Sequence, residues 1–224
     1  MQNGLSARRL LCYTAGMIIL AIGLTLTAQS GLGTSPLTSI AFVLGKCLDM
    51  RFSDITLIMF SVFVIVQIIL EKKKTPAAAG KLLLQIPLSI LFTRVMGLIQ
   101  RLVDLTGAAS PLRFFVLILA VILTGIGAAL TLYTNLIPNP GDGIVKALAC
   151  SVAKPLGRVK NVFDIANVTA AALISLIVLG RLEGVGIGSV IAMLGVGRVI
   201  ALCNLLLKKK EGQGRHQQDD PERS

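Results

Sequence analysis

The sequence contains no tryptophan and a single histidine, and its four cysteines show no metal-ligand spacing. The histidine, His216, lies in a polar tail, so a serine- or cysteine-type catalytic set and a His-containing metal site lack their imidazole. The cysteines all lie in apolar segments without a CxxC pair, which is typical of small buried side chains. We therefore expect no enzyme activity, no catalytic residue, no metal ion and no cofactor.

Apolar side chains are abundant, since they make up 54% of the 224 residues. A soluble domain of this size could not bury that share in one core, whereas a bilayer core accepts helices of about 20 apolar residues. Six runs approach this length, over residues 10–29, 54–70, 82–100, 114–133, 162–180 and 185–207. The sequence therefore predicts an all-α, polytopic membrane protein with about six transmembrane helices, embedded in the lipid bilayer.

The net charge of +11 is concentrated beside these runs. Three lysines follow residue 71 and three more follow residue 207, where cations mark cytoplasmic loops. This distribution favours a membrane protein over a nucleic-acid binder, whose basic face contacts many phosphates. Arg8 and Arg9 precede the first run, which we interpret as a spanning helix rather than a cleaved signal because it is long and has an internal counterpart. The positive-inside rule then places both termini in the cytoplasm.

The chain repeats itself at a shift of 104 residues, which pairs Gly23 with Gly127 and Pro36 with Pro140. Eight of the 23 positions from 22 to 44 are identical at this shift. We predict one membrane domain over residues 1–207, built from a repeat at about 8–102 and another at about 112–207, followed by a disordered cytoplasmic tail at 208–224. With three spans in each half the second repeat is inverted, a design common in secondary transporters.

Each half also contains a Gly/Pro-rich break that leads into a short helix of about 14 residues. Proline suits the first helical position, and Ser35 and Asn139 then stand at the capping positions. A helix of this length rises only about 21 Å, so we expect two half-helices that enter from opposite faces and meet near the midplane. The residues of the two turns are Gly31, Gly33 and Pro36 in the first, and Pro138, Pro140, Gly141 and Gly143 in the second.

Three segments together carry a family resemblance. They are the Gly-Leu-Gly-Thr-Ser-Pro turn at 31–36, the Asn-Pro-Gly-Asp-Gly turn at 139–143, and the glycine-rich run at 184–200. In their order and spacing they resemble the YczE/YyaS/YitT-like family of bacterial integral membrane proteins, over about residues 8–207. The resemblance implies a multi-pass protein of the bacterial cytoplasmic (inner) membrane, in a family without an established biochemical activity.

Polar residues near the breaks are candidate ligands. Asp142 lies one turn into the second short helix, where an ionisable group is costly in a membrane and usually faces a cavity or a partner. It either binds a cation, a proton or a polar solute, or interacts with the positive end of its helix dipole. Lys146, four residues later, either neutralises Asp142 or attracts an anionic solute. Thr34 and Ser35 either donate to a ligand or cap their helix.

Further polar residues lie within the long runs. Arg94 and Arg198 are equivalent at the shift of 104. Each either binds a carboxylate or phosphate ligand through its planar fork, or pairs with Asp54, with Asp164 or with exposed carbonyls of a broken helix. Asp164 and Asn167 share one helix face by their spacing of three, and they either line a polar path or connect neighbouring helices.

Two functional hypotheses follow. The leading one is a small-solute or ion transporter or permease whose site lies between the breaks, with Ser35, Asn139 and Asp142 next to the solute and the two arginines behind them. The alternative is a non-transporting membrane scaffold or accessory protein, in which these polar groups are structural. Its partner is then a second copy of the chain or another membrane protein.

Overall fold

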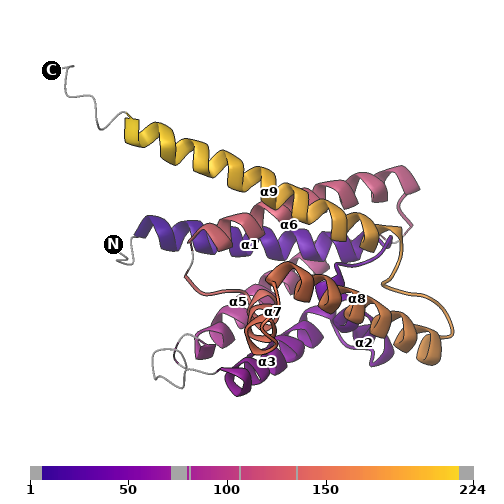
Figure 1. Cartoon of the computed structure of the whole chain (residues 1–224). Coiled ribbons are helices and arrows are strands. Elements are labelled where there is room, and N and C mark those ends of the chain that lie inside the picture. Colours follow the sequence, from indigo (N-terminus) through magenta and orange to yellow (C-terminus); the bar gives the residue numbers. More distant parts are fainter. Residues whose placement is uncertain (1–6, 72–79, 81, 106, 135, 217–224) are drawn as a thin grey trace.

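The computed structural model describes residues 7–71, 80, 82–105, 107–134 and 136–216, and this part of the chain is helical without a β-strand (Figure 1). The elements are α1 (Ala7–Gln29), a 3-10 turn η1 (Pro36–Thr38) leading into α2 (Ser39–Cys47), α3 (Phe52–Leu70), α5 (Gln85–Leu102), α6 (Ser110–Thr134), α7 (Pro140–Ser151), α8 (Leu156–Ile174) with a π-helical end η2 (Ser175–Leu179), and α9 (Ile187–His216).

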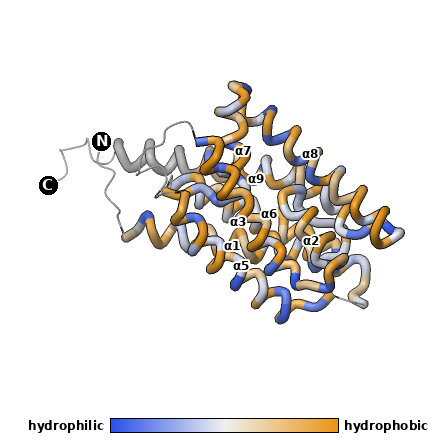
Figure 2. The backbone as a smooth tube through the Cα atoms, turned by 90° about the horizontal axis from the view of Figure 1, so that it is seen from below, coloured by the Kyte–Doolittle hydropathy of each residue, from blue (hydrophilic) through white to orange (hydrophobic). Residues whose placement is uncertain are grey.

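Five of these helices are long and apolar enough to cross a membrane by length and composition, namely α1, α3, α6, α8 with η2, and α9. These helices carry exposed leucine, isoleucine, valine and phenylalanine side chains, which suit contact with lipid. Figure 2 shows that hydrophobic residues predominate along them. The chain is therefore an all-α, multi-pass membrane protein, as predicted. The remaining predicted span, 82–100, corresponds to α5, which is not among the five; two arginines and two glutamines, Gln85, Arg94, Gln100 and Arg101, lower its hydropathy.

Helices α1 and α6 form the centre of the molecule and run antiparallel (Figure 1). Glycine makes their close approach possible: a Cβ atom added to Gly23 would lie 2.5 Å from the backbone nitrogen of Thr124, and one added to Gly127 would lie 2.4 Å from that of Leu20. Both pairs obey the same shift, because Thr124 is the counterpart of Leu20. Gly23 of the first half therefore packs against Thr124 of the second, and Gly127 of the second half packs against Leu20 of the first. Two halves related by a two-fold axis make paired contacts of this kind.

The remaining helices pack in the same reciprocal order. Helix α5 packs on α1, and α9 packs on α6. Helix α2 packs against α8, and α7 packs against α3, so each short helix lies on the long helix that follows the other short helix. Because α1 and α6 are antiparallel, the breaks that follow them lie at opposite ends of the pair (Figure 1).

The two short helices begin with Pro36 and Pro140 at their first positions, as predicted. Their first turns touch, since a Cβ atom on Gly141 would lie 2.4 Å from a methyl carbon of Leu37, the counterpart of Gly141 at the shift of 104. Each of the two helical segments spans 12 residues, over 36–47 and 140–151. Asn139 accepts a hydrogen bond from the Gly141 backbone at 3.1 Å, whereas Ser35 makes no side-chain cap.

Helix α9 continues to His216, beyond the last apolar residues. Residues 208–216, which the sequence predicts to belong to a disordered tail, are therefore helical. Lysine, glutamate and glutamine are good helix formers, whereas Gly212 and Gly214 are poor ones. A helix that has already begun in the apolar run needs no new nucleus to extend through this segment. Residues 217–224 of the predicted tail lie outside the described residues.

Candidate functional site

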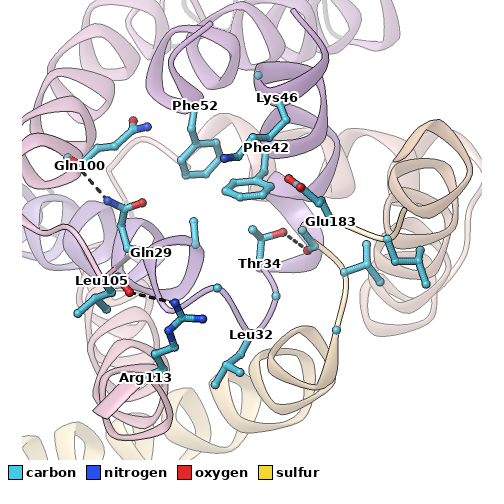
Figure 3. Close-up of a pocket in the computed structure, with 18 of the residues that line it drawn as sticks. Gln29, Leu32, Thr34, Phe42, Lys46, Phe52, Gln100, Leu105, Arg113 and Glu183 are labelled. Carbon is cyan, nitrogen blue, oxygen red and sulfur yellow. Dashed lines mark hydrogen bonds between the residues drawn. The ribbon is translucent and has the colours of Figure 1, made fainter. Parts of the chain in front are cut away.

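A cavity of about 630 Å³ opens at the end of the molecule where α1 ends and α6 begins (Figure 3). Its walls come from residues 28–34, from the end of α2 and the start of α3, from the end of α5, and from the loop 182–186 that precedes α9. Arg113, in the first turn of α6, completes the wall. The volume lies within the range of small-molecule sites.

The first break forms the inner part of this cavity. Thr34 donates from its backbone nitrogen and from its hydroxyl to the carbonyl of Gly184, at 2.9 and 2.8 Å, and Gly188 donates to the carbonyl of Leu32 at 2.8 Å. Gly33 and Gly184 have φ values of 134° and 72°, which favour glycine. These hydrogen bonds join the first break to the loop before α9, although Thr34 and Gly184 lie 150 residues apart in the sequence.

One wall of the cavity is polar. Gln29 donates from its amide nitrogen to the carbonyls of Gln100 and Val103. Arg113 donates from Nη2 to the carbonyl of Leu105 at 3.2 Å. Two buried atoms here, Arg113 Nε and Gln100 Oε1, have no hydrogen-bond partner within the described part of the chain. A buried polar atom without a partner is costly, so this wall is suited to a ligand or to ordered water.

The opposite wall is aromatic, and the rim is charged. Phe42 and Phe52 meet edge to face with ring centroids 5.7 Å apart, and Lys46 Nζ lies 6.0 Å from the Phe42 ring (Figure 3). Glu183 also lines the cavity, and its carboxylate is paired with Arg181. The cavity therefore offers a guanidinium and amides on one side and apolar rings on the other.

The predicted site residues do not come together in this cavity. Thr34, Gly31 and Gly33 line it, whereas Ser35 is not among its lining residues. Asn139, with Pro138 and Pro140, lines a second, far smaller space of about 10 Å³ at the other break. Among the described residues, the space beside Asn139 is therefore far smaller than the cavity beside the first break.

Asp142 and Asp164 form a separate polar group where α7 meets α8. Lys160 Nζ lies 3.5 Å from Asp164 Oδ2, and its charge acts on both carboxylates. Asp164 Oδ1 is buried without a hydrogen-bond partner in the described chain, and the amide of Asn167 donates to the backbone one turn earlier at 2.8 Å. The predicted pair of Asp142 with Lys146 is not among the ion pairs of the described residues, and Lys146 is exposed.

Arg94 and Arg198 are both exposed on the outer surface of their helices. Of the carboxylates proposed as their partners, Asp54 accepts from Arg51 at 2.8 Å, and Asp164 pairs on its own helix. The two arginines therefore do not stand behind a shared central site.

Sequence reasoning missed Arg113 and its counterpart Arg9, although the shift of 104 connects them. Arg9 Nη2 donates to the carbonyl of Thr134 at 3.0 Å, at the end of α6. Arg113 lies against Gly31, just past the end of α1. Arg9 lies near the start of α1 and contacts the end of α6, just before the second break. Arg113 lies near the start of α6 and contacts the first break. The shift of 104 residues predicts this equivalence of the two arginines.

A buried amide pair was also missed. Gln67 on α3 and Gln85 on α5 exchange hydrogen bonds of 3.1 and 3.2 Å, and Gln67 also donates to the carbonyl of Pro140 at 3.2 Å. A Cβ atom on Gly143 would lie 2.3 Å from Gln67 Oε1. These side chains connect the first turn of α7 to α3 and α5.

Comparison with known proteins places this architecture in a family. The family model DUF6198, described as a family of unknown function, matches residues 7–205. The chain belongs to this family. It is also similar to the "Uncharacterized protein YyaS" of Bacillus subtilis (strain 168), with 29% identity over 130 residues. This match covers 58% of the chain and 63% of YyaS, which is less than two thirds of that relative's length. No solved structure matches the chain.

The DUF6198 match extends from the start of α1 almost to the end of the apolar part of α9. It therefore includes both breaks, the cavity with Arg113, the polar group around Asp142, and the exposed arginines. The similarity to YyaS agrees with the family resemblance found in the sequence motifs.

Proposed function

We propose that this membrane protein is a small-solute or ion transporter or permease of the bacterial inner membrane, with both termini in the cytoplasm, and that the cavity beside Arg113 is the outer entrance of its route. The observation that supports the proposal most is the difference between the two breaks. The first adjoins a cavity of about 630 Å³, and the second adjoins a space of about 10 Å³. An entrance open to one side only is what alternating access requires.

Reciprocal packing supplies the mechanism for exchange between two such states. The contacts of Gly23 and Gly127, and the touching pair Leu37 and Gly141, follow the shift of 104. In an inverted repeat, each half can adopt the arrangement that the other half holds. The alternate state then opens the space beside Asn139 and closes the cavity beside the first break.

The polar group around Asp142 lies on the inner side of the route in this proposal. Asp142 stands beside the second break, and Asp164 presents a buried oxygen that has no hydrogen-bond partner among the described residues. Opening of the second break would bring these carboxylates into contact with water and solute. A coupling proton or cation would bind there, as intramembrane carboxylates do in other pumps and transporters.

Accessibility of single cysteines tests the exchange of states. In a chain without its four native cysteines, we place a cysteine at Gln29 in the cavity, at Asn139 in the closed space, or at exposed Arg101 as a control. Alternating access predicts that Gln29→Cys and Asn139→Cys react with membrane-impermeant thiol reagents from opposite sides. A transported solute changes the two rates in opposite directions and leaves Arg101→Cys unchanged.

Flux into proteoliposomes completes the test. Radiolabelled lactate, alanine, succinate and sodium are offered to vesicles that contain the natural chain, the Asp142→Asn variant, or no protein. Uptake above that of empty vesicles supports transport, and unaltered uptake by Asp142→Asn removes that residue from the mechanism. Fixed, one-sided reactivity of both cysteines together with background uptake would reject the proposal.

A membrane scaffold or accessory role is a second candidate, favoured by the exposure of Arg94 and Arg198. Both lie near the middle of their apolar helices, where a charge facing lipid is costly. A carboxylate on a neighbouring membrane protein would offset this cost. Purification from native membranes would then yield a stoichiometric partner that Arg94→Gln and Arg198→Gln lose and Arg101→Gln keeps.

A further inference from the structure

The guanidinium of Arg113 is held in place at the cavity with hydrogen-bonding capacity left unused. Its Nη2 donates to the Leu105 carbonyl, which fixes the plane of the group. Its Nε is buried without a partner in the described chain, and Gly31 lies beside Nη1. A Cβ atom at Gly31 would lie 3.5 Å from Nη1, so the glycine leaves this side of the arginine uncrowded. A planar fork of N–H donors matches the two oxygens of a carboxylate or phosphate.

The amides next to Arg113 offer acceptors rather than donors. Gln29 already uses its amide nitrogen for two backbone carbonyls, so its oxygen is the atom left for a ligand, and its side chain lies on the cavity wall in Figure 3. Gln100 Oε1 is buried and lacks a donor within the described residues. A molecule that fits this wall carries a hydroxyl or ammonium donor near its anionic group.

The charges around the cavity agree with an anionic ligand. Arg113 is the charged group on the inner wall, and Lys46 stands at the rim. Of the two acidic residues that line the cavity, Glu183 is paired with Arg181, and Asp49 is exposed at the rim. Phe42 and Phe52 supply the apolar side.

We propose that this cavity binds a small organic oxyanion, whose carboxylate or phosphate pairs with Arg113 and whose adjacent donor binds the oxygen of Gln29. As a statement about the transported substrate this rests on the proposed function, but as a statement about binding it does not. Arg9 stands at the equivalent place by the opposite break, where it donates to the Thr134 carbonyl. An oxyanion released at that end would meet the same kind of group that bound it at the first.

Ligand-induced stabilisation of the full chain tests the proposal. The protein is placed in phosphatidylcholine nanodiscs, and its unfolding temperature is followed as lactate, the neutral analogue lactamide, or inorganic phosphate is added. A ligand that binds the folded state raises this temperature by an amount that grows with the logarithm of its concentration once that exceeds Kd. A parallel set of discs contains phosphatidylglycerol, which separates a lipid headgroup from a soluble oxyanion.

The expected result is stabilisation by lactate or phosphate, or by phosphatidylglycerol, and none by lactamide. Arg113→Gln weakens this binding by at least about 10-fold, as expected for loss of a charged hydrogen bond. Arg113→Lys keeps the positive charge but lacks the planar fork of donors, so its affinity for the ligand should lie between those of the natural chain and Arg113→Gln. Arg101→Gln, an exposed arginine at the same end but outside the cavity, binds like the natural chain. If Arg113→Gln fails to fold, Arg113→Lys and the lactamide comparison carry the test.

Equal stabilisation by lactamide and lactate, full binding by the Arg113 variants, or no response to any of the oxyanions overturns the proposal. These outcomes are distinct from those of the transport test. Arg113-dependent binding without uptake rejects transport and keeps the oxyanion site. Uptake that is the same in the natural chain and in the Arg113 variants supports transport and rejects the oxyanion site as the substrate site.

Discussion

Replacing Gly127 by alanine adds one methyl group at the closest approach of α1 and α6. The new Cβ atom would lie 2.4 Å from the nitrogen and 2.7 Å from the Cα of Leu20, and 2.7 Å from the carbonyl oxygen of Gly16. All three are backbone atoms, so no side chain can rotate away. The helices must separate by about 1 Å to restore ordinary contact, and a gap of that size forfeits a quarter to a half of the dispersion energy of each affected atom pair.

The expected loss of stability is about 1 to 3 kcal/mol, the usual cost of overpacking a close-packed core. For a chain of this size it corresponds to a fall of about 2 to 12 °C in unfolding temperature. Gly23→Ala should cost a similar amount, because its Cβ atom would lie 2.5 Å from both the backbone nitrogen and the hydroxyl of Thr124. Gly197→Ala is the matched control, since this α9 glycine has no atom within 4 Å of its added Cβ.

Thermal unfolding in one detergent, followed by circular dichroism, compares these variants. The double variant is the sharper measurement. Once one methyl group has separated α1 from α6, the second causes less additional strain. The double variant of Gly23→Ala and Gly127→Ala should therefore lose less stability than the sum of the two single losses. Equal unfolding temperatures for Gly127→Ala and Gly197→Ala would refute the reasoning, and strict additivity would show that the two glycines do not act on one shared interface.

Two further predictions concern the second break. Gln67→Leu removes the hydrogen-bond partner that Gln67 provides to Gln85 and to the carbonyl of Pro140, and should lower the free energy of unfolding by about 1 to 3 kcal/mol. Chemical denaturation measures this loss. The double variant of Gln67→Leu and Gln85→Leu should recover part of it, and a further loss in the double variant would contradict the prediction. Asn139→Ala removes the cap of α7 and should cost about 1 kcal/mol, whereas Ser35→Ala at the equivalent place should cost close to nothing because that serine makes no cap. Equal effects of these two alanines in the same denaturation experiment would show that the cap contributes little.

Much of the fold could be predicted because it depends on local properties of the chain. Apolar runs of membrane length indicated the long helices, and the prolines at 36 and 140 indicated where the short helices begin. The end of α9 was less predictable, because a polar sequence of good helix formers is helical or disordered according to what precedes it. The count of spans and the inverted orientation of the halves stay predictions.

The candidate site was predicted less well, because it depends on contacts between distant segments. Asp142 was expected beside the solute, but the cavity of about 630 Å³ lies beside residues 28–34, and Asp142 is grouped with Asp164 and Lys160 instead. Arg113 was not singled out, since nothing in its sequence neighbourhood reveals that residues from the ends of α1 and α5 lie beside it. Gln67 and Gln85 lie 18 residues apart in sequence without a shared motif, so only the packing of α3 against α5 unites them.

The contact between Leu37 and Gly141 constrains how such a chain could arise. In a dimer of two identical three-helix subunits, this position would face its own copy, leucine against leucine with overlapping atoms or glycine against glycine with an empty space. Once both subunits are joined in a single polypeptide, a bulky residue can be matched with a hydrogen atom. A large residue matched with a glycine at one locus requires two halves of different sequence, so neither half of this chain alone should assemble with a second copy of itself through this contact.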